Sequence, residues 1–548
     1  MVPNKMKALV LTFSFCLIAV LLNAQTPTKY WVKFKNKNGS PYSVSNPSAY
    51  LSAKSIARRT NQGIAIDMTD IPVNQTYINQ VNATGAQVFQ RSKWLNAAIV
   101  IISNPTQLTA INSLTCVLSS SPVARIHTSK PDEDIKPLAQ SFKRSEVTTG
   151  YNYGPSFSQV NQIGADCMHD LGYRGQNMVI AVIDAGFEQA DVNPVFDSLR
   201  NEGRILGTRD YVMGNTLVYE DYLHGANCLS LMAGNTPGQL IGTGPKASYW
   251  LLRSEDALTE KIIEENNWVV AAEFADSVGA DITTTSLGYT TFDISSQDHV
   301  YADLNGKTSV ASIAATMASR KGMFVLNAAG NEGGGPWTYI GVPADADSIC
   351  TVGSVNSGGF HSNFSSIGPT SDGRIKPDLS SMGENSYVCS PGYNFGTGSG
   401  TSYATPILAG AVACLWQANP TKTNMQILQA LKATASQSAS PDNNYGWGIP
   451  NMCAAHNYLN PVSIKQLDQT LGFKLFPNPT LENLYFKLNQ TPLKVILTDV
   501  LGKEMEVSFI ENDSHQYVIH FSHKMAPGIY SLSIKTSEGF INSKFIKE

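Results

Sequence analysis

Three side chains that could act as acid, base and nucleophile stand in separate segments of the chain. Asp184 ends the continuous apolar run NMVIAVID, and His224 lies within DYLHGANCLSLMAG. Ser402 lies in GTSYATP, directly before the apolar sequence ILAGAVACLWQA. A serine hydroxyl becomes a nucleophile when an adjacent base takes its proton and a third group orients that base. The three residue types therefore raise the hypothesis of nucleophilic catalysis.

Each of these residues also has a structural interpretation. Asp184 could cap the turn after its strand, and His224 could be a structural histidine near the start of a helix. Ser402 could be an ordinary helix N-cap. Pro406 argues against that last interpretation. It has no N–H to donate to the carbonyl of Ser402, so it fits only near a helix start or at a kink. A helix beginning at Ser402 would also favour negative charge beside the hydroxyl.

A fourth candidate is Asn331, in the sequence GMFVLNAAGNEGGG, where a buried strand leads into a glycine-rich turn. Acyl transfer needs hydrogen-bond donors placed at the oxyanion of the tetrahedral intermediate, and an asparagine amide can supply one. The alternative is an asparagine that only shapes the turn.

The elements that would position these residues alternate along about residues 155–458. Short apolar runs alternate with helical patterns, which is typical of a parallel α/β sheet. The clearest predicted strands are NMVIAVID, SYWLLR, DITTTSL, GMFVLNAAG and SICTVGSV. An aspartate at the carboxyl end of such a strand stands where open α/β sheets place their sites.

Together these segments resemble the subtilisin-like serine peptidase family, whose motifs occur in the same order, Asp then His then Ser. The resemblance covers about residues 155–458, and we place the catalytic domain at residues 150–460. It implies an α/β fold, with a parallel sheet flanked by helices. The stretch NFSSIGPTSDGRIKPDL is similar to the loop that precedes the nucleophile in this family.

The resemblance also assigns roles. It implies that Ser402 attacks the scissile carbonyl, His224 transfers the proton, Asp184 orients the imidazole and Asn331 binds the oxyanion. The substrate would pair as an added strand with Ser286, Leu287 and Gly288.

Three motifs depart from the family pattern, but none of the departures removes a catalytic group. Ala226 and Asn227 replace Thr and His, Tyr403 replaces Met, and the aspartate motif reads DAG instead of DSG or DTG. The departures concern substrate preference more than activity.

The N-terminus has the features of a secretory signal over residues 1–24. Lys5 and Lys7 precede an apolar run of about 15 residues, shorter than the ~20 that a membrane span needs. Residues 25–145 resemble the propeptides of secreted Bacteroidetes peptidases and predict a small α+β unit. The polar segment 129–153 reads as a linker, with the cut expected within 130–155. A permanent accessory domain is the alternative.

Residues 465–548 show alternating patterns such as YVIHFS and IYSLSIKT, which predict a small β-sandwich. The motifs KLFPNP, DVLGKE and PGIYSLSI and the ending KFIKE resemble the sorting domain of type IX secretion cargo. This implies secretion machinery as a partner and release or attachment at the outer surface. An ordinary carbohydrate-binding or structural sandwich is the alternative.

Composition limits the partners that the chain is expected to bind. The chain has 548 residues, 15% of them charged, and a net charge of −4, which implies no nucleic-acid partner. We expect protein or peptide substrates, the propeptide as inhibitor, and no cofactor or metal, with a structural calcium ion left unassigned. Spacing gives no disulfide pairing, and Cys414 is predicted to pack in a helix. The competing hypothesis is a surface adhesin with an inactive peptidase-like domain.

Overall fold

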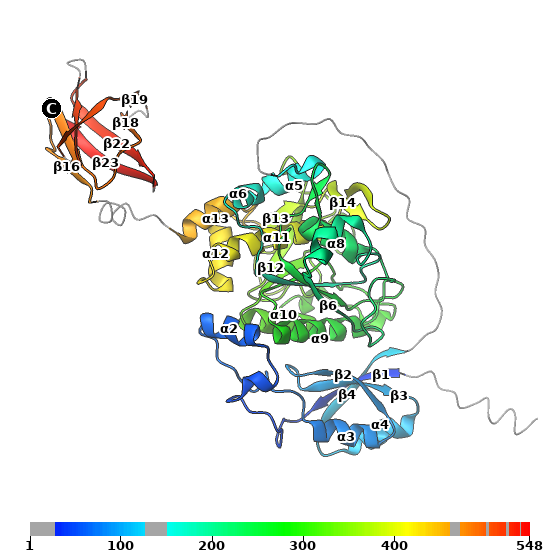
Figure 1. The fold of residues 1–548 in the computed structure, drawn as a ribbon. Coiled ribbons are helices and arrows are strands. Elements are labelled where there is room, and N and C mark those ends of the chain that lie inside the picture. The colour runs from blue at the N-terminus through cyan, green and yellow to red at the C-terminus, as the bar shows by residue number, and fades with distance from the viewer. Residues whose placement is uncertain are drawn as a thin grey trace, which may run out of the picture. The chain divides into compact units, whose positions relative to one another are not determined.

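The structure, a computed structural model, describes residues 28–125, 151–460, 472–499, 503–513, 515–521, 525–537 and 539–548. The predicted signal, most of the predicted linker and the core of DVLGKE lie outside these ranges. The chain forms two compact units, one ending at Leu459 and the other beginning at Asn460 (Figure 1).

A seven-stranded parallel sheet forms the centre of the first unit, with the order β13-β12-β11-β10-β5-β9-β6. The strands are β5 (Val179–Asp184), β6 (Ile205–Asp210), β9 (Ser248–Arg253), β10 (Ile282–Thr285), β11 (Phe324–Ala328), β12 (Cys350–Val355) and β13 (Leu379–Met382). All five strands predicted from sequence are present. The parallel α/β fold is therefore confirmed.

Helices cover both faces of this sheet (Figure 1). Because side chains alternate along a strand, Ile180 and Val182 of β5 join one hydrophobic core, while Ala181 and Ile183 join the other. The first core contains α8 (His224–Ala233) and α11 (Thr401–Gln417), and the second contains α9 (Ile263–Val278) and α10 (Val310–Arg320). Burial on both faces explains why β5 reads as a continuous apolar run.

The same unit has shorter elements around the sheet. They are α5 (Phe157–Gln162), α6 (Ala165–Asp170), α7 (Asp197–Asn201), α12 (Asn424–Ala433), α13 (Met452–Leu459), β7 (Asn235–Thr236), β8 (Leu240–Ile241), β14 (Ser386–Ser390) and β15 (Asn394–Gly398). Cys414 is fully buried in α11, as predicted.

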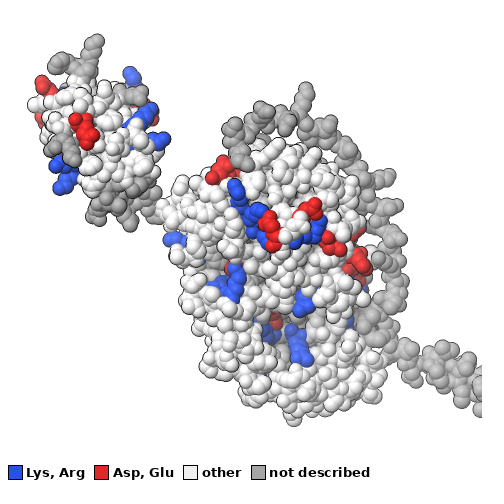
Figure 2. Space-filling view, viewed as in Figure 1, with Lys and Arg blue, Asp and Glu red and all other residues white. Residues whose placement is uncertain are grey.

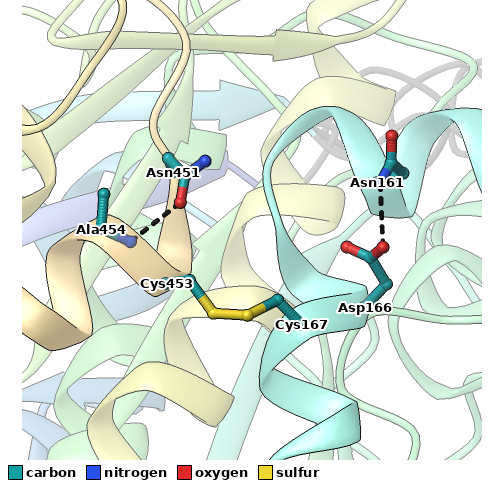
Figure 3. Close-up of a disulfide and its surroundings, with 6 residues drawn as sticks. All are labelled: Asn161, Asp166, Cys167, Asn451, Cys453 and Ala454. Carbon is teal, nitrogen blue, oxygen red and sulfur yellow. Dashed lines mark hydrogen bonds between the residues drawn. A yellow bond between two sulfur atoms is a disulfide. The ribbon is translucent and has the colours of Figure 1, made fainter. Parts of the chain in front are cut away.

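A disulfide joins Cys167 of α6 to Cys453 of α13, across a sequence separation of 286 residues (Figure 3). The other cysteines of the described residues are free and buried: Cys116, Cys228, Cys350, Cys389 and Cys414.

The N-terminal part of the first unit is the predicted small α+β unit. Its antiparallel sheet has the order β2-β3-β1-β4. Its elements are β1 (Thr28–Phe34), α2 (Ala53–Asn61), α3 (Gln75–Ala83), β2 (Gln87–Ser92), β3 (Ala97–Ile102), α4 (Pro105–Ser113) and β4 (Val117–Arg125).

The second unit is the predicted β-sandwich. One sheet has the order β16-β17-β21-β20 and the other β19-β18-β22-β23. The strands are β16 (Lys474–Phe476), β17 (Asn483–Lys487), β18 (Lys494–Thr498), β19 (Glu504–Glu506), β20 (Phe509–Asp513), β21 (Gln516–His520), β22 (Gly528–Thr536) and β23 (Gly539–Lys547). Leu484 and Phe486 of one sheet share a hydrophobic core with Leu532 and Ile534 of the other.

On the face drawn in Figure 2, lysine and arginine side chains lie beside aspartate and glutamate on an otherwise uncharged surface. Over the described ranges, no helix is both long enough and apolar enough to cross a membrane.

Candidate active site

The carboxyl ends of the parallel strands hold the first candidate side chain. Asp184 is the last residue of β5 and pairs in register with Arg253, the last residue of β9. Its carboxylate is fully buried. A buried carboxylate is stable as an ion only when it is paired or hydrogen-bonded, so its partners define what it does.

His224 is the principal side-chain partner of Asp184. Its Nδ1 lies 2.7 Å from Oδ1 of Asp184, which also accepts the backbone N–H of Ala185 at 2.8 Å. His224 is the first residue of α8, as predicted, and its side chain keeps 22% of its exposure. A Cβ at Gly225 would lie 2.3 Å from the carbonyl oxygen of Gly186. Glycine therefore lets α8 begin directly against the aspartate turn.

The pKa of His224 reflects these surroundings. Burial of the imidazole lowers the pKa, while the carboxylate of Asp184 raises it. The net result is a pKa well above its usual value. The carboxylate thus stabilises the imidazolium form, which is the form that a general base takes after accepting a proton.

The alanine of the DAG motif affects the hydrogen bonding of Asp184. Oδ2 of Asp184 is buried without a hydrogen-bond partner among the described residues. The residue after Asp184 is Ala185, which has no hydroxyl to donate where a serine or threonine would have one. The carboxylate is therefore held through Oδ1 alone.

Ser402 is the second residue of α11, and Gly400 is the N-cap. The N-cap interpretation of Ser402 is therefore wrong. The backbone carbonyl of Ser402 accepts hydrogen bonds from the hydroxyl of Ser286 at 2.8 Å and the thiol of Cys228 at 3.3 Å. Because Cys228 lies one turn after His224 on α8, these contacts bring the starts of α8 and α11 together with the segment after β10.

Asn331 lies beside the same helix start. Its Oδ1 accepts hydrogen bonds from the backbone N–H of Thr401 at 2.9 Å and from its hydroxyl at 3.0 Å. This fixes the amide and leaves the Nδ2 donors directed elsewhere. A Cβ at Gly400 would lie 2.7 Å from Oγ of Ser402 and 3.6 Å from Nδ2 of Asn331. Glycine at 400 therefore keeps open a space that both atoms border.

The three residues predicted to bind substrate extend beyond the sheet. β10 ends at Thr285, and Ser286, Leu287 and Gly288 follow it, with Gly288 exposed. The buried amide of Asn327 donates to the carbonyl of Leu287 at 3.1 Å, which ties this segment to the end of β11.

Arg253 was not predicted from the sequence. Its buried guanidinium donates to the carbonyl of Ala185 at 3.0 Å and lies 2.9 Å from Asp210 and 3.3 Å from Asp221. It therefore joins the aspartate turn to the loop that leads into His224. The sequence feature that could have indicated it is the arginine at the end of the apolar run SYWLLR, because a charged side chain at a buried position requires partners.

Three family profiles match consecutive parts of the chain. They are "Peptidase S8 propeptide domain, Bacteroidota" at residues 29–136, "Subtilase family" at residues 175–448 and "Secretion system C-terminal sorting domain" at residues 474–548. The last profile supports export by type IX secretion.

Curated bacterial peptidases are similar over the same region. Subtilisin from Bacillus pumilus is 30% identical over 300 residues, which cover 54% of this chain and 97% of that protein. Subtilisin NAT from Bacillus subtilis subsp. natto is 29% identical over 353 residues, 64% of this chain and 82% of that protein. Serine protease AprX from Bacillus subtilis is 31% identical over 307 residues, 50% of this chain and 65% of that protein.

These matches bear out the peptidase hypothesis. The chain belongs to the subtilase family and is a secreted serine endopeptidase, with a propeptide domain before its catalytic domain and a secretion sorting domain after it.

Proposed function

We propose that Asp184, His224 and Ser402 form the catalytic triad and that Asn331 supplies an oxyanion donor. The observation that carries this proposal is the 2.7 Å hydrogen bond between His224 and Asp184 at the carboxyl edge of the sheet. The contacts of Ser402 and Asn331 around Gly400 support it.

The proposed reaction follows from these positions. Ser402 attacks the scissile carbonyl, and His224 accepts the hydroxyl proton and returns it to the leaving amine. Asp184 holds the imidazole in the tautomer that carries its proton on Nδ1 and stabilises the imidazolium. A water molecule, activated by His224, then hydrolyses the acyl-enzyme. Only protein groups and water take part in this sequence, so no cofactor is required.

The oxyanion forms beside the start of α11. The backbone N–H of Ser402 and Nδ2 of Asn331 would donate to it, and the positive end of the helix dipole would stabilise the same charge. Both Oδ1 contacts of Asn331 with Thr401 support this orientation, because they fix the amide before substrate arrives.

We place the substrate along Ser286, Leu287 and Gly288. An extended peptide could add there as a strand, with its main chain hydrogen-bonded to this segment. The anchoring of Leu287 by Asn327 and of Ser286 by Ser402 supports a rigid binding edge.

We assign residues 25–145 to an inhibitory propeptide with its linker, 150–460 to the catalytic domain and 465–548 to the sorting domain. The propeptide would block the cleft and assist folding until the linker is cut. The match of residues 29–136 to a propeptide profile supports this assignment.

Covalent labelling tests the triad. A fluorophosphonate should modify the native enzyme on Ser402, as located by peptide mapping. His224→Ala should lose labelling because the hydroxyl then lacks its base. Labelling of a different serine, or undiminished labelling of His224→Ala, would contradict the assignment.

A further inference from the structure

Helix α2 in the propeptide domain buries charge where a surface helix usually buries apolar residues. Its buried residues are Ser55, Arg58 and Arg59, and the two arginines are only 5% and 1% exposed. Buried arginines are rare unless they are paired. We call residues 52–70, which contain α2 and the loop after it, the arginine strap.

Arg58 binds the ends of two catalytic-domain helices. Its guanidinium contacts the carboxylate of Asp276 in the last turn of α9 and the carbonyl oxygen of Ala280 just beyond it. Its Nε donates to the carbonyl of Lys321, which directly follows α10, at 3.3 Å. Carbonyls at a helix C-terminus lack intrahelical donors and carry partial negative charge, so a guanidinium suits them.

Arg59 joins the same carboxylate to the strap itself. It donates to Asp276 at 2.7 and 2.8 Å and to Asp70 at 2.9 and 3.0 Å. Lys321 of the catalytic domain pairs with Asp70 at 3.0 Å in the opposite sense. Burial of Asp276 raises its pKa, but Lys93, Arg58 and Arg59 together lower it below its usual value. The propeptide domain and the catalytic domain therefore each contribute both positive and negative side chains to this contact.

The shape of the catalytic domain is matched to the strap. Gly279 and Gly322 follow α9 and α10, each with a φ of +89°. A Cβ at Gly279 would lie 2.7 Å from Cβ of Lys54, and one at Gly322 would lie 2.8 Å from Nε2 of Gln62. Gln62 also donates to the carbonyl of Gly322 at 2.7 Å. Glycine at both helix ends thus allows close approach of the strap.

The strap lies at the amino ends of the parallel strands, whereas the active site lies at their carboxyl ends. α9 leads into the start of β10 and α10 into the start of β11. Lys54 donates to the carbonyl of Asn177, just before β5. Asp184 stands at the other end of that strand. Figure 1 shows α2 beside the ends of α9 and α10. The strap therefore does not cover the catalytic groups.

A second contact, about one helical turn before Asp276, holds the propeptide sheet. The buried carboxylate of Glu273, in the middle of α9, accepts hydrogen bonds from the hydroxyl of Ser92 and the backbone N–H groups of Lys93 and Trp94. The sheet and the strap thus attach the propeptide domain to neighbouring turns of α9, and Lys93 links the two contacts because it also pairs with Asp276 at 3.0 Å.

We propose that the surface formed by Asp276, the carbonyls after α9 and α10, and Lys321 is a docking site for the arginine strap. Asp276 and the carbonyls bind Arg58 and Arg59, and Lys321 binds Asp70. This site anchors the propeptide to the catalytic domain without blocking the active site. The proposal rests on the propeptide-inhibited peptidase proposed above. Two linked contacts raise the effective concentration of each other, so the cut propeptide stays bound and activity appears only when both contacts are lost.

To test this proposal, the maturation of a full-length chain carrying both Arg58→Met and Arg59→Met is monitored beside that of the wild-type chain. These changes leave the mature catalytic domain unaltered, so its kcat should match wild type after the propeptide is gone. We measure the lag between linker cleavage and casein hydrolysis, and the propeptide that co-elutes with cut enzyme on size exclusion. Loss of a buried charge network should weaken retention by about 10²-fold or more and shorten the lag accordingly.

Arg91→Met is the matched control, because Arg91 is an exposed propeptide arginine that pairs with Gln75 of the same domain. It should retain the wild-type lag. If the double variant does not fold, Gln62→Ala decides, and a shortened lag is expected there too. Cut propeptide that is retained as in wild type by the folded variants overturns the anchor. A wild-type chain that is never cut and shows no activity overturns the proposed function instead.

Discussion

The protonation state of His224 links the geometry of the site to its pH dependence. A general base must be neutral to accept the serine proton, so activity should be present above the pKa of His224 and lost as pH falls through it. Because Asp184 raises this pKa despite burial, the acid limb should lie above the usual histidine value of 6.5.

Asp184→Asn tests this link. Without the carboxylate, burial dominates and the pKa of His224 should fall, so the acid limb of kcat/KM should move to lower pH. The rate itself should drop by about 10⁴-fold, a magnitude established for serine peptidases with this triad. A pH profile of peptide hydrolysis measures both. An acid limb that stays in place would contradict the role of Asp184.

Asn331→Ala removes one proposed oxyanion donor. We expect kcat to fall by roughly 10²–10³ with KM little changed, a magnitude established on subtilisin itself, because the hydrogen bond strengthens only in the transition state. Steady-state kinetics on a peptide substrate measure the split. Asn394→Ala, at the exposed first residue of β15, is the control and should behave as wild type. If KM instead rose by this factor while kcat stayed unchanged, Asn331 would not act as an oxyanion donor.

At the scale of elements, sequence periodicity predicted the sheet well because its strands are buried on both faces. β5 and β9 match the predicted runs, and His224 begins a helix as expected. Two features could not be predicted. Arg253 depends on partners that meet only when strand ends and loops are placed. The pairing of Cys167 with Cys453 depends on α6 and α13 packing side by side, which spacing does not encode.

The disulfide should stabilise the catalytic domain by limiting the unfolded chain. The variant Cys167→Ser with Cys453→Ser should lower the free energy of unfolding by about 2–4 kcal/mol. Denaturant unfolding in a Ser402→Ala background, which avoids self-digestion, measures the change. A reductant should destabilise the parent chain by a similar amount and leave the double variant unaffected. Equal stability of the two chains without reductant would exclude the expected contribution.

At the scale of the whole molecule, the sorting domain forms its own compact unit. Its removal should therefore leave the catalytic domain folded. Deleting residues 470–548 should trap active enzyme in the periplasm, as followed by activity in cell fractions and in the medium. A full-length Ser402→Ala chain should be exported normally, because export does not need catalysis. Normal export of the truncated chain would contradict the sorting role.

The most direct test of the whole account is the casein-hydrolysis rate of purified Ser402→Ala against Ser399→Ala. Ser399 lies between β15 and α11, three residues before Ser402, and its hydroxyl accepts the backbone N–H of Asn385. Loss of the nucleophile should reduce the rate by about 10⁶-fold. Ser402→Ala should still fold, with its propeptide uncut, while Ser399→Ala should cleave casein as wild type does. Undiminished hydrolysis by folded Ser402→Ala would contradict the triad.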